Sequence, residues 1–333
     1  MRAALMALLS GAALLVATPA TAQTTWVVHV IGLGGAPEYT EAFTGWANDI
    51  TEQVTSRWSV DADRVITLGE DTSLEGVDQE SRRENIESTV ARIASEAAPT
   101  DRVLFVLIGH GTWRNDVAAL NIPGRDLAAE DWNTLLAGLG DRMVAVVNVA
   151  SSSGPFAEAL AAPGRIIMTA TRSGQERNET QFGRYFAEAF GGDAADLDKD
   201  GRLSLLEAFV YARSETARYY DEEGLIATEH AQLEDDGDGE AIDIPVDDST
   251  DGRVAATFRF ISATASDADA ALPSDSTSVR IQAEIAQIEA ALAVLRSQRD
   301  AMTQEEYDAE LESLLVDLAL KNRELRGRSG GET

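Results

Sequence analysis

The stretch Val103-Leu-Phe-Val-Leu-Ile108-Gly109-His110-Gly111 decides the fold of this chain. Its six consecutive apolar residues, which end at a glycine, predict a strand buried on both faces, as parallel sheets have. His110 follows that strand between two glycines, which allow other backbone or a ligand to come close. Because open parallel sheets bind ligands at the carboxyl ends of their strands, we expect a site at His110.

Segments with strand and helix patterns alternate on both sides of this stretch. Further buried strands are predicted over 26–31, 64–68, 143–147, 165–170 and 254–261. Helices are predicted from Pro37 onward and over 81–97, 126–139, 156–160, 178–190 and 205–223. This alternation predicts an α/β fold with a doubly wound, mostly parallel sheet over residues 23–261. His29, inside the first strand, is expected to be a core histidine whose hydrogen bonds are satisfied.

The composition excludes several classes of function. The chain has 333 residues and a formal net charge of -30, which repels phosphate backbones, so we expect no nucleic-acid partner. It has no cysteine, which rules out disulfides, thiolate metal sites and a thiol nucleophile. Such an acidic chain attracts cations instead, and many of its carboxylates follow Asp193.

The first 22 residues have the pattern of a secretory signal peptide. A basic start at Arg2 precedes an apolar run and the end Ala20-Thr-Ala22. The apolar run is too short to span a membrane. We therefore expect cleavage after Ala22, a periplasmic or secreted protein, and no membrane span in the mature chain.

Residues 196–207 match the calcium loop of an EF-hand at its diagnostic positions. Gly201 stands where the loop must turn sharply, and helices are predicted on both sides, as the motif requires. The expected Ca²⁺ ligands are Asp196, Asp198, Asp200, the backbone carbonyl of Arg202, Ser204 and the bidentate Glu207. Outside the cytoplasm a weak site of roughly 10⁻⁴–10⁻³ M suffices, so we expect a structural calcium site rather than a sensor. An acidic surface loop is the alternative.

A second acidic stretch, Glu234-Asp-Asp-Gly-Asp-Gly239, resembles the start of another calcium loop. Pro245 stands where its closing glutamate should be. We expect a solvated turn here, with an irregular cation site as the alternative.

Two motifs each come directly after a predicted buried strand. Because these two strands are neighbours, the motifs can meet at one edge of the sheet. Ile108-Gly-His110-Gly and Val149-Ala-Ser151-Ser-Ser153-Gly154 resemble the motifs of the caspase-like clan of cysteine peptidases, especially its legumain-like branch. The resemblance extends over residues 26–220, and 168–176 resembles the segment that lines the specificity pocket in that family. It implies a caspase-like fold, with His110 as the base and Ser151 where the family has its nucleophilic cysteine.

The serine at position 151 changes the expected chemistry. A hydroxyl is far harder to deprotonate than a thiol, and the sequence offers no third group that would orient His110. We expect a non-catalytic protein that binds peptide or protein partners. The alternative is an active hydrolase in which His110 is the base, Ser151 the nucleophile and amides near Gly111 the oxyanion donors. In either case Ser151–Ser153 can cap the following helix.

The C-terminal part has a different pattern. Residues 262–277 are rich in Ala, Ser and Asp and predict a linker. Over 278–326, apolar residues recur four and three apart, and Thr303-Gln-Glu-Glu306 is a capping box, so we expect an α-helical hairpin. It is either a packing appendage or a homo-oligomerisation element. The second case gives a third class of function, a structural assembly subunit.

Overall fold

The computed structural model of the protein describes residues 23–197, 200–244 and 250–261, residues 288, 291, 292, 295 and 299, and residues 302–329. Its centre is a seven-stranded sheet with the strand order β11-β9-β8-β4-β1-β2-β3. These strands are β1 (Thr25–Ile31), β2 (Val65–Gly69), β3 (Gln79–Glu80), β4 (Arg102–Ile108), β8 (Met143–Asn148), β9 (Arg165–Thr169) and β11 (Gln232–Glu234). Neighbouring strands are parallel, except that β11 runs antiparallel to β9.

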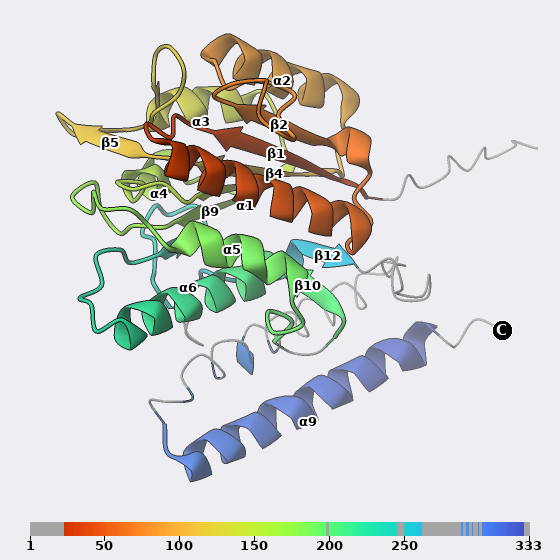
Figure 1. The fold of residues 1–333 in the computed structure, drawn as a ribbon. Helices are drawn as coiled ribbons and strands as arrows, with labels where there is room; N and C mark the ends of the chain where they lie inside the picture. The colour runs from red at the N-terminus through yellow and green to blue at the C-terminus, as the bar shows by residue number, and fades with distance from the viewer. Residues whose placement is uncertain are drawn as a thin grey trace, which may run out of the picture.

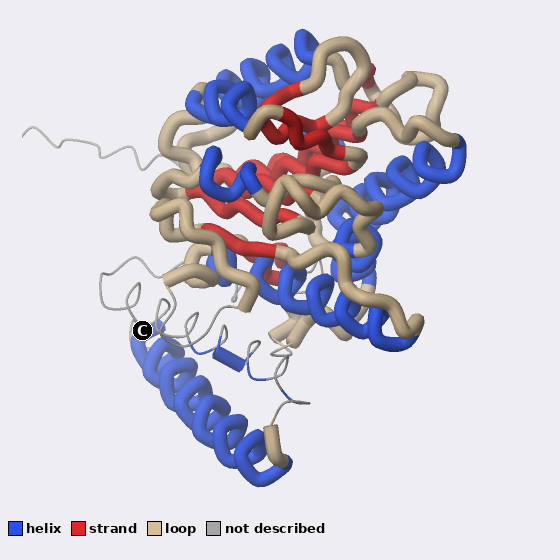
Figure 2. The backbone as a smooth tube through the Cα atoms, turned by 90° about the vertical axis from the view of Figure 1, so that its left-hand side faces the viewer, coloured by secondary structure: helices blue, strands red, loops and turns tan. Residues whose placement is uncertain are grey.

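Helices cover both faces of this sheet (Figures 1 and 2). One face carries α1 (Pro37–Ser56), α5 (Phe182–Gly191) and α6 (Leu205–Glu222). The other carries α2 (Arg83–Glu96), α3 (Ala129–Ala137) and α4 (Pro155–Leu160). The predicted α/β fold with a mostly parallel, doubly wound sheet is confirmed.

Strand β4 shows why the sequence favours this arrangement. All of its residues are buried. Leu104, Val106 and Ile108 point into the core beneath α1 and α5. The alternating residues Val103, Phe105 and Leu107 point into the core beneath α2 and α3. A strand between two helical layers must be apolar at every position, which is the pattern of this stretch.

Two smaller sheets flank the main one. The first consists of β5 (Gly111–Arg114), β6 (Val117–Leu120) and β7 (Leu127–Ala128), and it starts directly after His110. The β5–β6 turn has Asn115 and Asp116 in the left-handed conformation, as a two-residue hairpin turn requires.

The second small sheet pairs β10 (Arg202–Ser204) with β12 (Arg259–Ile261). The predicted strand over 254–261 is only partly right, since the chain first forms a 3-10 turn, η2 (Ala255–Thr257). The side chain of Asp235 explains this, because its Oδ2 accepts a hydrogen bond from the amide of Ala255 at 2.7 Å. A further 3-10 turn, η1 (Ala62–Arg64), precedes β2.

The predicted signal peptide and linker lie outside the described residues. In the tail, α9 (Gln304–Ser329) is a helix, and the described residues at 288, 291, 292 and 295 are helical too. Leu292, Leu295 and Tyr307 are buried. The pairing of two helices and the oligomerisation stay predictions. Within the described part of the chain, no helix is both long and apolar enough to cross a membrane.

His29 is a core residue, as expected, but its hydrogen bonds are not satisfied. The side chain is fully buried on β1, and neither ring nitrogen has a partner among the described residues. Burial lowers the pKa of His29 to about 3. The ring is therefore neutral at physiological pH and contributes mainly as core volume.

Candidate functional site

The ends of β4 and β8 bring His110 and Ser151 to the same edge of the sheet. The two strands are parallel neighbours, and the amide of Val149 still donates to the carbonyl of Leu107 at 2.9 Å. Beyond that point, Ser151 Oγ lies 3.2 Å from the amide nitrogen of Gly111 and 3.4 Å from its carbonyl oxygen. The predicted neighbourhood of the two motifs therefore exists at the level of the backbone.

The imidazole ring of His110 lies against helix α1. It packs edge-on against Tyr39 and Phe43 of α1, at centroid distances of 4.7 and 5.2 Å. In the described part of the chain, no hydrogen bond joins the ring to Ser151. A nucleophile needs its base within about 2.6–3.2 Å, so this arrangement lacks the pair that a hydrolase uses.

The turn after β8 is strained and tied to the neighbouring segment. Ser152 has a φ of 57°, a left-handed conformation that non-glycine residues seldom adopt, and its amide donates to the carbonyl of Glu176 at 2.8 Å. The hydroxyl of Ser153 lies 3.1 Å from that of Thr171. The expectation that these serines cap the next helix is wrong, because α4 has Gly154 at its N-cap and no side-chain cap.

A loop of residues 172–181, which follows β9, lies beside the turn at Ser152. Glu176 Oε1 lies 2.6 Å from His230 Nδ1, and Glu176 Oε2 accepts from the amide of Arg172 at 2.8 Å. The loop ends at Glu229, whose carboxylate accepts from the amides of Gln181 and Phe182 at the start of α5.

Neither Glu229 nor His230 belongs to a motif that marks it as a site residue in the sequence. The only available signal was that His230 is one of three histidines in the chain. Burial raises the pKa of Glu229 to about 7, although its hydrogen bonds from Gln181, Phe182 and Tyr220 work in the opposite direction.

The predicted calcium loop folds around the carboxylate of Asp196. Its Oδ1 accepts from the amide of Asp200 and its Oδ2 from that of Gly201, each at 3.1 Å. Gly201 has a φ of 80°, which places the sharp turn where the motif requires it. Asp200 Oδ1 accepts from the amide of Arg202 at 2.8 Å, and the Arg202 guanidinium lies 3.8 Å from Asp200 Oδ2. Asp198 lies outside the described residues.

Glu207 closes this loop from the first turn of α6. Its Oε1 accepts from the amide of Leu197 at 2.9 Å, on the opposite side of the loop. Its Oε2 accepts from the amide and the hydroxyl of Ser204, both at 2.8 Å, and Ser204 caps α6 in return. The side chain is 6% exposed, and burial raises its pKa, with the charge of Asp200 adding to the effect.

Helices α5 and α6 flank the loop, and strand β10 lies inside it. Leu203, the expected inward-facing apolar residue, is buried and pairs with Phe260 of β12. Of the proposed ligands, Asp196 and Glu207 therefore belong to one tightly closed loop, together with Asp200, Arg202 and Ser204.

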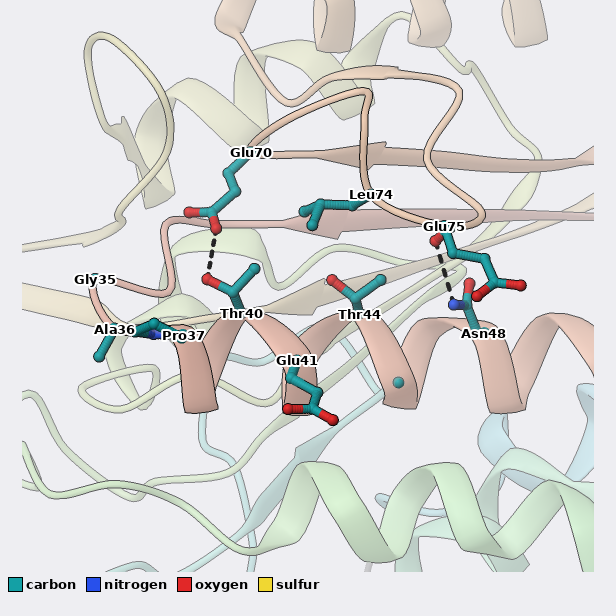
Figure 3. A pocket seen from close by; sticks show the side chains of 11 residues that line it. Gly35, Ala36, Pro37, Thr40, Glu41, Thr44, Asn48, Glu70, Leu74 and Glu75 are labelled. Carbon is teal, nitrogen blue, oxygen red and sulfur yellow. Dashed lines mark hydrogen bonds between the residues drawn. The ribbon is translucent and has the colours of Figure 1, made fainter.

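An open pocket of about 840 Å³ lies elsewhere, between α1 and the β2–β3 connection (Figure 3). Glu70 lies at its end and accepts from the Thr40 hydroxyl at 2.5 Å and from the amide of Gly34 at 3.0 Å. Neither His110 nor Ser151 lines this pocket.

No protein-family model matches this chain, and a search of curated proteins finds no match either.

We predict that Gly111→Ala destabilises the fold by about 1–3 kcal/mol or more. A Cβ at this position would lie 2.0 Å from the carbonyl oxygen of Ser151, so β5 would have to move away from the β8 turn. Gly45→Ala is the matched control, since a Cβ there meets no atom within 4 Å and lies inside α1. It should stabilise the helix by roughly 0.5–1 kcal/mol. Urea unfolding measures both, and equal effects would contradict the close approach.

Glu229 should make stability depend on pH in a direction unusual for a carboxylate. Its pKa is about 7 in the folded protein and about 4.5 in the unfolded chain, so the folded state holds the proton more tightly. Its contribution to stability is fully present below pH 4.5 and is lost as the pH rises through about 7.

The advantage of the wild type over Glu229→Gln in unfolding free energy should therefore be roughly 1–3 kcal/mol larger at pH 5 than at pH 8. Chemical unfolding in a chelator measures this difference. Glu223→Gln, at an exposed position, should show no such change with pH. A difference for Glu229→Gln that stays constant between the two pH values contradicts the assignment.

Proposed function

We propose that this chain is an exported calcium-binding protein on a caspase-like scaffold, which binds peptide or protein partners rather than cleaving them. The observation that carries the calcium assignment is the closure of the 196–207 loop by Glu207. This carboxylate comes from the outgoing helix and reaches the amide of Leu197 next to the first predicted ligand. The export rests on the signal-peptide pattern of residues 1–22.

The donor set suits a hard cation. Carboxylate, hydroxyl and carbonyl oxygens are the ligands that Ca²⁺ prefers, and this loop offers them at alternating positions. Glu207 is buried although a charged carboxylate favours water, so a bound cation would offset both its burial and its repulsion from Asp200. When bound, Ca²⁺ would hold α5 and α6 together through Asp196 and Glu207.

Calcium at about 10–100 times its dissociation constant should stabilise the protein by roughly 1–3 kcal/mol per site. We expect Glu207→Gln to lose the increment that belongs to this loop, because the neutral amide cannot serve as a bidentate ligand. Thermal unfolding with and without calcium, together with equilibrium dialysis, measures the loss.

Glu223→Gln is the matched control directly after the last residue of the same helix, and it should keep the full calcium response. A calcium response in Glu207→Gln equal to that of the wild type contradicts the assignment of the loop.

The geometry at the sheet edge supports binding rather than hydrolysis. The Ser151 hydroxyl contacts the backbone of Gly111, while the His110 ring packs edge-on against Tyr39 and Phe43. Without a base in contact, a serine hydroxyl is a weak nucleophile. The edge still presents Trp113, Arg172 and Arg177 around the turn, where an extended peptide can find apolar and hydrogen-bonding partners.

A serine hydrolase is the second candidate, and two observations favour it. The amide of Gly111 lies within hydrogen-bond distance of Ser151 Oγ, and the strained turn at Ser152 is of a kind that clusters at active sites. A rotation of the His110 ring away from Tyr39 and Phe43 would be needed before it could accept the proton of Ser151.

Labelling with a fluorophosphonate separates the two candidates. We expect no adduct at Ser151 by mass spectrometry under conditions in which a serine hydrolase standard reacts completely. An adduct that Ser151→Ala abolishes and His110→Ala strongly reduces would overturn the non-catalytic proposal.

A further inference from the structure

A second group of carboxylates gathers between β11 and the segment before η2. One carboxylate oxygen from each of Glu234, Asp236 and Asp251 lies within 4.8 Å of the other two. Two ligands on opposite sides of a calcium ion lie about 4.6–5.2 Å apart, which is twice the usual ligand distance. The three side chains are therefore close enough to share one cation.

Glu234 supplies an independent reason to expect a ligand here. The residue is fully buried, and its Oε1 accepts from the amides of Gly237 and Gly239 at 2.7 and 3.3 Å. Its Oε2 is buried as well and has no hydrogen-bond partner among the described residues. A buried carboxylate oxygen without a partner is costly unless something else satisfies it.

The backbone around the group is fixed in place. The amide of Asp235 donates to Asp251 Oδ1 at 2.7 Å, and the amide of Gly252 donates back to Asp235 Oδ1 at 2.9 Å. The expectation of a solvated turn is only partly right for this stretch, since residues 236–239 form an accessible turn but Glu234 and Asp235 are buried. Asp236 remains accessible to solvent, which leaves an entry path for an ion.

Electrostatics also favours a cation at this place. No ion pair within the described part of the chain joins Glu234 or Asp236 to a basic side chain. Besides the burial of Glu234, the negative charges of Asp251 and Asp236 repel its own and raise its pKa. A divalent ion would remove that repulsion and satisfy the free oxygen of Glu234.

We propose that Glu234, Asp236 and Asp251 form a second site for a hard divalent cation, separate from the 196–207 loop. Water and nearby carbonyls complete the coordination of an ion that three carboxylates hold. The ion ties the end of β11 to the segment that leads through η2 into β12. Strand β12 pairs with β10 inside the 196–207 loop. The second ion therefore also stabilises β12, the strand that pairs with the first loop.

Calcium binding to the full mature chain tests this proposal by counting ions. Equilibrium dialysis at millimolar free calcium should find two ions per wild-type chain and one in Asp236→Asn, whose altered side chain is solvent-accessible. Glu234→Gln should lose the same ion. Glu207→Gln should lose the other ion and keep this one, which separates the failure of one site from the failure of the other. The same counts with magnesium identify the preferred ion.

Asp238→Asn is the matched control, because Asp238 lies in the same turn but outside the cluster: its side chain accepts from the amide of Glu240, and its contact with Asp236 is made by its backbone amide, which the substitution keeps. It should keep both ions. Circular dichroism verifies that each variant is folded, and Asp236→Asn decides the outcome if the buried Glu234→Gln does not fold. Equal ion counts in the wild type and in Asp236→Asn would overturn the proposal, and so would equal losses in Asp236→Asn and Asp238→Asn.

Discussion

Hydrogen bonds from backbone amides to buried carboxylates hold the loops around the candidate sites of this protein in place. Glu229 accepts from the first amides of α5 and thereby fixes the loop beside Ser151. Glu207 closes the 196–207 loop, and Asp235 fixes the turn that leads into β12. Each of these carboxylates joins segments that lie apart in the sequence, and apolar residues such as Leu203 and Phe260 pack beneath the same loops.

These carboxylates are buried in a chain that already carries a large negative charge. Burial raises the pKa of Asp235 to about 6 and that of Glu229 to about 7, because a charged carboxylate is less stable away from water. Amides compensate only in part, since they carry partial charges. Cations would supply the rest where several carboxylates converge, and the two proposed sites lie at either end of the segment from Asp251 to β12.

The sequence was sufficient for the parts of the fold that local pattern determines. The apolar run of β4 and the helical periodicity after Pro37 predicted elements that the structure contains. The two motifs predicted that His110 and Ser151 follow neighbouring strands, and the structure brings these segments together at the level of the backbone. Other features depend on distant contacts and have no local signature. Strand β11 has three residues and pairs with β9 on one side and, through Leu233, with Ile242 on the other. The orientation of the His110 ring depends on Tyr39 and Phe43, which the motif does not contain.

A crystal structure of the chain grown with calcium tests the central claim most directly. We expect an ion in the 196–207 loop with oxygens of Asp196, Asp200 and Glu207 at about 2.3–2.6 Å, and Glu207 turned from the amide of Leu197 toward the ion. A well-ordered loop without an ion, in which Glu207 still accepts from Leu197 and Ser204 at millimolar calcium, would contradict the account.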